Sequence, residues 1–144
     1  MQEKLDKHFI KDYLQRHKYC VIATVSAEGK PEAALVAFSE SDNLEIIFGT
    51  SMDSRKFADI LGNPNIAVVI GWEDQATMQY EGAARVLEDS EWAALSHKHL
   101  TKQPASANFQ DSPDERYIAV TPKWIRYVEK ALDPRTITAR EVTF

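Results

Sequence analysis

Two cations follow a group of hydroxyl side chains in the segment GTSMDSRKFADIL, residues 49–61. The segment is typical of a strand end, a polar turn and the first turns of a helix. The helix dipole places partial positive charge at that end, which disfavours Arg55 and Lys56 unless an anion is also present. Hydroxyl donors, free backbone N–H groups and cations together are suited to binding phosphate. The segment therefore predicts a site for an anionic ligand group beside Thr50 and Ser54.

The same segment has a second interpretation that needs no ligand. Ser, Thr and Asp are ordinary N-cap residues, and Arg and Lys are good helix formers whose side chains can point into water. Helix starts of this composition are common. The residues alone leave both interpretations open.

The rest of the sequence lacks the patterns of several other kinds of site. His8 and His17 would lie on opposite faces of one helix, and a single cysteine provides no zinc-binding spacing. No Gly-x-Ser-x-Gly, Walker A or Gly-x-Gly-x-x-Gly motif occurs. We therefore expect no metal site and no obligatory catalytic side chain, and we expect Cys20 to be a buried apolar residue.

The composition predicts a single globular domain in the cytoplasm. The chain has 144 residues, of which 44% are hydrophobic and 27% charged, and its net charge is −5. This charge argues against binding to the phosphate backbone of nucleic acid. The lone cysteine allows no internal disulfide, the N-terminus is too charged for a signal peptide, and no apolar run is long enough to cross a membrane.

Apolar periodicity predicts a mostly β chain with inserted helices. The expected strands are 19–26, 32–39, 43–50, 66–72, 76–87 and 116–130, and the expected helices are 3–17, 51–62 and 91–100. Short connections between most strands favour an antiparallel barrel with helical decoration over a parallel sheet. We expect both faces of the uncharged strand 66–72 to be covered, a bulge or close approach at Gly82, and a loop at 101–114.

The order of these segments resembles the pyridoxamine 5'-phosphate oxidase-like family of FMN-binding split barrels. The resemblance rests on VIATVSAEGKPEAALVAF (21–38), on NLEIIFGTSMDSRKFADILGNPNIAVVIGW (43–72) and on MQYEGAARVL (78–87). It covers roughly residues 5–128. It implies that residues 1–144 form one antiparallel split β-barrel domain that binds FMN.

The resemblance also implies a role for each residue of the polar turn. Ser54, Arg55 and Lys56 correspond to the SRK motif with which the family grips the FMN phosphate. Thr50, with Gly49 beside it, corresponds to a position along the phosphate and the ribityl chain. The anion that the opening segment calls for would then be a phosphate monoester.

Further contacts are implied for the flavin ring. The strand whose backbone runs along the ring corresponds to Val36, Ala37 and Phe38. Thr77 falls where the oxidases place a glutamine that contacts the cofactor, and the neighbouring Gln79 is an alternative. Trp124 falls close to an aromatic residue that the family stacks near the flavin, although a place in the core or at a dimer interface fits it equally well.

The sequence also departs from the true oxidases. Ala34 and Ser39 stand where those enzymes carry an Arg and a Lys, and the C-terminal ITAREVTF lacks their basic substrate-binding segment. The resemblance therefore implies a divergent member that binds FMN through fewer contacts, and it argues against vitamin B6 oxidation as the activity.

Three functions remain as hypotheses. The first is a homodimeric FMN-dependent oxidoreductase that acts on a small molecule with an electron donor such as NAD(P)H. The second is a protein of the same fold that binds flavin, haem or a deazaflavin without turnover. The third, a dimeric interaction module without a cofactor, ranks last because the sequence shows no exposed hydrophobic stripe.

Overall fold

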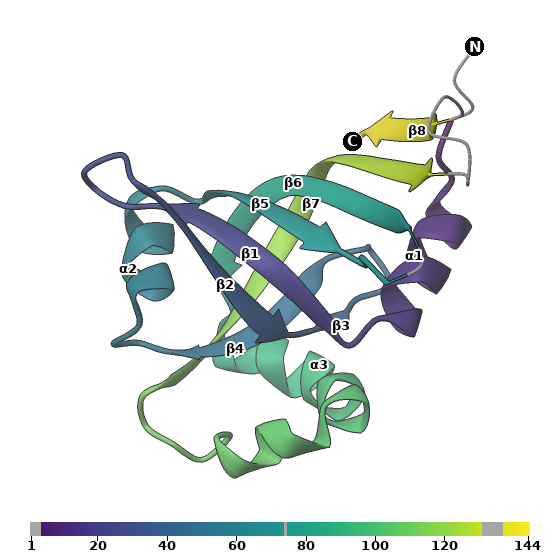
Figure 1. Cartoon of the computed structure of the whole chain (residues 1–144). Coiled ribbons are helices and arrows are strands. Elements are labelled where there is room, and N and C mark those ends of the chain that lie inside the picture. Colours follow the sequence, from purple (N-terminus) through teal and green to yellow (C-terminus); the bar gives the residue numbers. More distant parts are fainter. Residues whose placement is uncertain (1–3, 74, 131–136) are drawn as a thin grey trace.

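The chain forms one antiparallel sheet that curls into a half-barrel, with helices around it (Figure 1). The structure, a computed structural model, describes residues 4–73, 75–130 and 137–144. The strands are β1 (Tyr19–Val25), β2 (Pro31–Ala37), β3 (Ser39–Glu40), β4 (Ile46–Ser51), β5 (Asn65–Ile70), β6 (Ala76–Val86), β7 (Glu115–Lys130) and β8 (Ile137–Thr143). Their order is β2-β1-β5-β6-β7-β4-β3, and β8 pairs with β7. The expected mostly antiparallel β architecture is confirmed.

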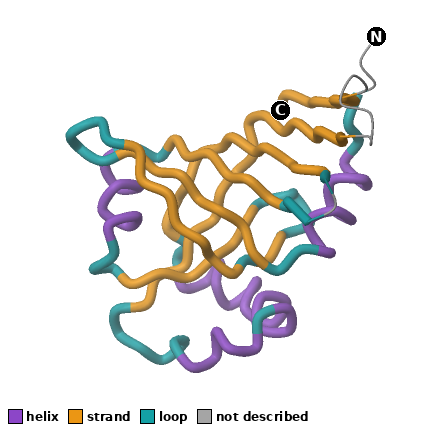
Figure 2. The backbone as a smooth tube through the Cα atoms, viewed as in Figure 1, coloured by secondary structure: helices purple, strands orange, loops and turns teal. Residues whose placement is uncertain are grey.

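The helices lie around the sheet (Figure 2). They are α1 (Lys7–Arg16), α2 (Arg55–Gly62), α3 (Asp89–Lys102) and the short 3₁₀ helix η1 (Pro104–Asn108). Helix α1 begins later than expected because Asp6 is its N-cap, accepting a hydrogen bond from the Phe9 N–H at 2.8 Å. None of the helices in the described part of the chain has the length and apolar character that crossing a bilayer requires.

The barrel has an open seam between β2 and β4. These two strands lie near each other, but no described ladder joins them, because β2 pairs with β1 and β4 pairs with β3 and β7. One edge of β2 therefore keeps backbone groups free for other partners. The short connection between the expected strands 32–39 and 43–50 also predicts a hairpin of these two strands, and this prediction is wrong for β2: the short β3 forms the hairpin with β4 instead, with Ser39 opposite Ile47.

The sheet's inner face carries the core. Ile22, Phe48, Ile70 and Met78 are almost completely buried there. Tyr80 is also buried, and its hydroxyl donates to the carbonyl oxygens of both Leu44 and Val120 at 2.8 Å. Tyr80 on β6 thus connects β7 with the turn that precedes β4, two segments that are far apart in the sequence.

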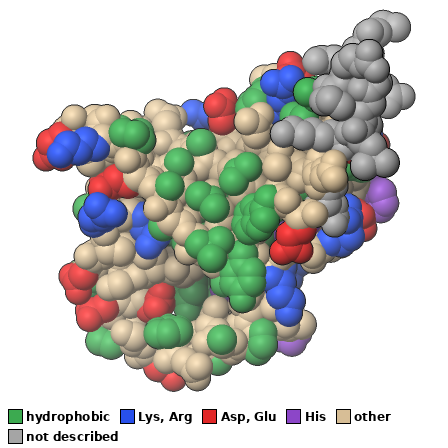
Figure 3. Space-filling view, in the orientation of Figure 1, with side chains coloured by type: hydrophobic (Ala, Val, Ile, Leu, Met, Phe, Trp, Pro, Cys, Tyr) green, Lys and Arg blue, Asp and Glu red, His purple; other side chains and the backbone are tan. Residues whose placement is uncertain are grey.

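The sheet's outer face is apolar over β1, β2 and β5, and no described element of this chain covers it there. Side chains on β5 alternate, so Ile66 and Val68 are buried while Ala67 is exposed and Val69 is half-buried. The expectation that both faces of this strand are covered is therefore wrong for the single chain. We call this surface the outer face; it comprises Val21, Ala23, Leu35, Ala67, Val69 and Trp124. Figure 3 shows hydrophobic side chains gathered on this side of the molecule.

A bulge bends β6 and β7, as the glycine predicts. The register between the two strands shifts between Glu81 and Gly82, with Pro122 opposite Gly82. A Cβ atom on Gly82 would overlap the carbonyl oxygen of Thr121. Glycine is required here because the two backbones approach closely.

The first half of the segment expected to be a loop, 101–114, is mostly helical. Helix α3 has Glu88 as its N-cap in a capping box with Glu91, so it begins before the expected residue 91. The helix continues to Lys102, and η1 follows. The buried His99 fastens both to the sheet: its Nδ1 lies 2.6 Å from Ser39 Oγ and its Nε2 lies 3.3 Å from Ser106 Oγ.

Candidate functional site

A cavity of about 290 Å³ lies in the open seam, and we call it the seam cavity. Its walls come from β2, β4, α2, η1 and the segment where β7 begins. The lining residues are Leu35, Val36, Ala37, Gly49, Lys56, Ser106, Phe109, Glu115 and Tyr117. The cavity is close in size to pockets that hold small molecules, which span roughly 300–1,000 Å³.

A smaller cavity of about 100 Å³ lies at the start of α2, and we call it the α2 cavity. It is lined by Ile22, Thr24, Glu32, Ala33, Ala34, Arg55 and Lys56. Lys56 lines both cavities. The seam cavity and the α2 cavity therefore both lie along β2, and the Lys56 side chain lies between them.

The hydroxyl groups at the start of α2 lie close together. Ser54 is the N-cap, and its Oγ accepts a hydrogen bond from the Phe57 N–H at 3.2 Å. Thr50 Oγ1 lies 2.8 Å from Ser54 Oγ. The two hydroxyls thus form one polar cluster beside the first turn of the helix.

The two cations have different surroundings. Arg55 is 80% exposed, and its Nη1 lies 2.8 Å from Glu32 Oε2. Lys56 is half-buried and has no ion-pair partner among the described residues. The anion that the sequence calls for is thus supplied for Arg55 by the chain itself, whereas Lys56 keeps its charge available to a ligand.

A second carboxyl group lies beside Glu32. Asp59 is buried, and its Oδ2 accepts a hydrogen bond from Thr24 Oγ1 at 2.8 Å. A hydrogen bond with Asp59 raises the pKa of Glu32, burial adds to the increase, and the charge of Arg55 opposes it. The α2 cavity therefore contains both signs of charge, and Glu32 competes with any bound anion for Arg55.

The residues expected along the ring separate into two groups. Val36 and Ala37 line the seam cavity, as does Gly49, which was expected along the phosphate and the ribityl chain. Phe38 does not: its ring is buried under Lys102 Nζ, 3.9 Å from the ring centroid, and its carbonyl oxygen accepts a hydrogen bond from Gln103 Nε2 at 2.9 Å. The structure therefore brings the free edge of β2 to the cavity only as far as Ala37.

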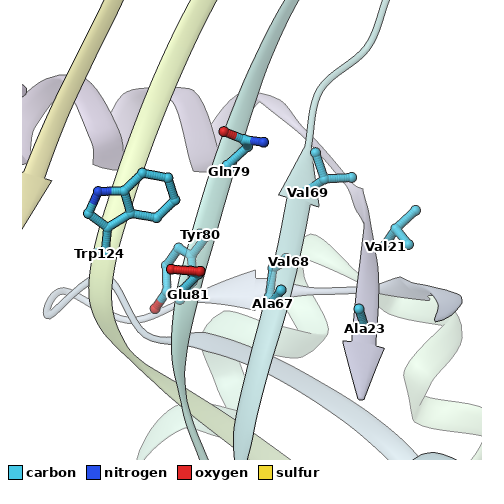
Figure 4. A pocket seen from close by; sticks show the side chains of 9 residues that line it. All are labelled: Val21, Ala23, Ala67, Val68, Val69, Gln79, Tyr80, Glu81 and Trp124. Carbon is cyan, nitrogen blue, oxygen red and sulfur yellow. The ribbon is translucent and has the colours of Figure 1, made fainter. Parts of the chain in front are cut away.

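The expected contacts from β6 and β7 lie elsewhere. Gln79 and Trp124 line a separate hollow of about 220 Å³ on the outer face (Figure 4). Thr77 is half-buried. It lies two residues before Gln79 on β6, so both side chains project from the same face of the strand. Within one chain, these three residues do not meet Lys56.

Five residues of the seam cavity were missed by sequence reasoning, among them Leu35 on β2. Glu115 and Tyr117 come from β7, and Ser106 and Phe109 come from η1 and the residue after it. The strand expected at 116–130 does indicate that Tyr117 belongs to a sheet. Nothing in the sequence showed that this strand pairs with β4, which places Tyr117 opposite Gly49.

The buried Ser39 and His99 form a structural pair, closed to solvent. Ser39 is 3% exposed and His99 is 1% exposed. Burial, and then the charge of Lys102, lower the pKa of His99 to about 4. The pair holds α3 on the sheet. Among the described residues, no group of three or more His, Cys, Asp or Glu side chains is placed to hold a metal ion.

Comparison with known proteins identifies the family. The sequence model described as pyridoxamine 5'-phosphate oxidase matches residues 7–129, which is most of the chain. The chain belongs to the pyridoxamine 5'-phosphate oxidase family. A pyridoxine/pyridoxamine 5'-phosphate oxidase of Bombyx mori is 32% identical over 108 residues, which cover 73% of this chain but 42% of that protein. The chain thus spans less than half the length of this oxidase relative.

Solved structures of this family's fold have different ligands in their names. A heme binding protein from Mycobacterium smegmatis aligns with a TM-score of 0.80 at 17% identity, covering 98% of this chain and 59% of that one. A pyridoxamine 5'-phosphate oxidase-related, FMN binding protein from Nostoc punctiforme aligns with a TM-score of 0.62 at 14% identity, covering 88% and 87%. At these identities the likeness establishes the split-barrel fold alone.

Proposed function

We propose that the protein is an FMN-binding flavoprotein that acts as an oxidoreductase on a small molecule. The observation that carries this proposal is the position of Lys56. It is a half-buried cation without an ion-pair partner among the described residues, and it lies between two cavities at the positive end of α2. A phosphate monoester is an anion of the right size and charge for this place.

The chain's own groups fit the phosphate. Lys56 supplies charge, while Ser54, Thr50 and the free N–H groups of the first turn of α2 supply hydrogen bonds. Arg55 can add a second charge once it releases Glu32. Ala34, which lines the α2 cavity, contributes no charge where the true oxidases have an arginine. The phosphate would thus be held by fewer cations than in those enzymes.

The seam cavity fits the ring. The free edge of β2 at Val36 and Ala37 offers backbone hydrogen-bonding groups, and Gly49 lines the same cavity from β4. Bound FMN would supply the hydride or electron transfer, which needs no catalytic side chain from the protein. The residues of the seam cavity would bind the ring, orient it and shield it from water.

We also propose that the active form is a homodimer joined through the outer face. This face is apolar and uncharged over β1, β2 and β5, and Leu35 on it is 61% exposed. Leu35 also lines the seam cavity, so a second copy on the outer face would adjoin the ligand. Thr77, Gln79 and Trp124 would then contact the FMN bound by the other protomer.

Haem binding is the second candidate, because the Mycobacterium smegmatis neighbour is named a heme binding protein. Haem iron is held by His, Cys, Met or Tyr side chains. Of the described residues that line the seam cavity, Tyr117 alone is of such a type. The cavity's donors therefore favour a phosphorylated flavin over haem.

A titration with each ligand tests this proposal. The purified protein is titrated with FMN, with riboflavin and with haemin, followed by flavin fluorescence and visible absorption. We expect FMN to bind most tightly, and we expect the bound flavin to be reduced by NADH or NADPH and reoxidised by an acceptor. Tight haemin binding without FMN binding would reject the flavin proposal. A bound flavin inert to both nucleotides would reject NAD(P)H-dependent turnover and leave a flavin carrier.

A further inference from the structure

The hydroxyl of Tyr117 is held in a fixed position, and no described residue forms a hydrogen bond with it. The Tyr117 ring stacks on Trp92 with centroids 3.4 Å apart and planes 6° apart, and the side chain is 8% exposed. Its buried hydroxyl has no hydrogen-bond partner among the described residues. An unpaired buried hydroxyl is unfavourable, so a phenylalanine would serve the packing at least as well. Because the residue lines the seam cavity, a ligand there can supply the missing partner.

Glu115 is the second unpaired group on the same wall. It is half-buried, and among the described residues its carboxylate has neither an ion-pair partner nor a hydrogen-bond donor. Burial raises its pKa. Glu115 and Tyr117 are two residues apart on β7, so their side chains project from the same face of the strand.

Glu115 and Tyr117 both pack over Gly49, whose lack of a side chain makes room for them. A Cβ atom at Gly49 would lie 2.9 Å from Glu115 Oε1 and 3.1 Å from Tyr117 Cε1. The carboxylate and the tyrosine ring therefore both border the place where β4 lacks a side chain. A planar ligand in the seam cavity would meet the two groups side by side.

The two groups have complementary hydrogen-bonding roles. The tyrosine hydroxyl can donate, and the glutamate carboxylate can accept. Together they match a ring edge that presents a carbonyl oxygen next to an N–H group. We propose that Tyr117 and Glu115 recognise this amide edge in the ring of the bound ligand. This assignment rests on the proposed function. In FMN, Tyr117 would donate to the C4=O oxygen of the ring and Glu115 would accept from N3–H.

An analogue of FMN tests this assignment. In 3-methyl-FMN a methyl group replaces the hydrogen on ring N3, so the phosphate end is unchanged while the donor to Glu115 is lost. Dissociation constants for FMN and 3-methyl-FMN are measured for the wild-type protein and for Tyr117→Phe and Glu115→Ala. The matched controls are Tyr127→Phe and Glu129→Ala on the same strand, which pair with each other at 3.5 Å. Melting temperatures are measured without ligand and with FMN.

The wild-type protein should bind FMN about tenfold more tightly than 3-methyl-FMN. Glu115→Ala should weaken FMN binding and bring the two constants together, while both control variants keep the wild-type ratio. Tyr117→Phe should weaken FMN binding roughly threefold to tenfold without lowering the melting temperature of the ligand-free protein, because its hydroxyl has no partner to lose.

Two results would overturn the assignment. Equal binding of FMN and 3-methyl-FMN by the wild-type protein would reject the contact to N3–H while leaving FMN as the ligand. A lower melting temperature of ligand-free Tyr117→Phe with unchanged FMN affinity would make the hydroxyl structural. Failure of the wild-type protein to bind any flavin would instead reject the proposed function, and this assignment with it.

Discussion

Arg55 Nη1 lies 2.8 Å from Glu32 Oε2, so one of the two cations at the start of α2 has an anionic partner within the chain. The neighbouring Lys56 has none among the described residues. Adjacent positions of one helix turn thus differ in their availability to a ligand. Glu32 acts as an internal competitor for a phosphate, and Lys56 as the cation that the phosphate meets first.

Replacing Glu32 with glutamine should strengthen FMN binding. The variant removes the competing carboxylate and frees Arg55, and the energy of an exposed ion pair corresponds to an increase in affinity of about two- to fivefold. Fluorescence titration with FMN measures it. Glu28→Gln, in the turn before β2, removes the same charge without a contact to Arg55 and should leave the affinity unchanged. Equal affinities of the two variants would show that Glu32 does not compete.

Replacing Leu35 with glutamate should dissociate the proposed homodimer. A charge on the outer face cannot be buried without a partner, so we expect a monomer by light scattering after gel filtration. FMN affinity should fall as well, because Gln79 and Trp124 of the other protomer are lost. The matched control is Leu61→Glu on α2, where the native leucine is 65% exposed compared with 61% for Leu35. A Leu35→Glu protein that stays dimeric would refute this interface.

Much of the barrel could be predicted from the sequence because local patterns determine it. Apolar and β-branched runs locate β1, β5, β6 and β7, and the polar residues 51–54 before an apolar helix locate the region of its N-cap, which the structure places at Ser54. Gly82 predicts the bulge because few other residues allow such a close backbone approach. Each of these inferences depends on residues that are close together in the chain.

The contents of the site could not be predicted in the same way. The pairing of Gly49 with Tyr117, and of Arg55 with Glu32, joins segments that only the folded sheet brings together. The uncharged β5 was expected to be covered on both faces, yet the cover for its outer face does not come from the described part of this chain. Periodicity indicates that a face is apolar, but it does not show which element or which second copy lies on it.

His99 should make the protein less stable as the pH falls from about 6.5 to about 4. The folded-state pKa is lowered to about 4, so in this range the unfolded chain binds the proton and the folded chain does not. The contribution of His99 to the free energy of unfolding is therefore complete above pH 6.5, and up to about 3 kcal/mol of it is lost as the pH falls toward 4. Urea denaturation at several pH values measures it.

Two variants show whether His99 causes this pH dependence of the free energy of unfolding. His99→Gln should flatten this part of the stability profile, while His97→Gln, at an exposed position on the same helix, should keep it. Identical profiles for both variants would show that another group causes the acid sensitivity.

Replacing Gly82 with alanine should destabilise the barrel. The added methyl group would overlap the Thr121 carbonyl oxygen, and overpacking of this kind costs about 1–3 kcal/mol. Gly62→Ala is the comparison, because a Cβ atom there meets nothing within 4 Å. Free energies of unfolding from urea titrations should differ by this amount. Equal stability of the two variants would mean that the bulge can relax around a side chain.

The most direct test of the central claim compares FMN with riboflavin, which differ by the phosphate. The ratio of their dissociation constants is measured for the wild-type protein, for Lys56→Ala and for Lys7→Ala, a charge-matched control on α1. We predict that the wild-type protein prefers FMN, that Lys56→Ala reduces this preference about tenfold, and that Lys7→Ala retains it. A Lys56→Ala protein with the wild-type ratio would contradict the assignment of Lys56 to the phosphate.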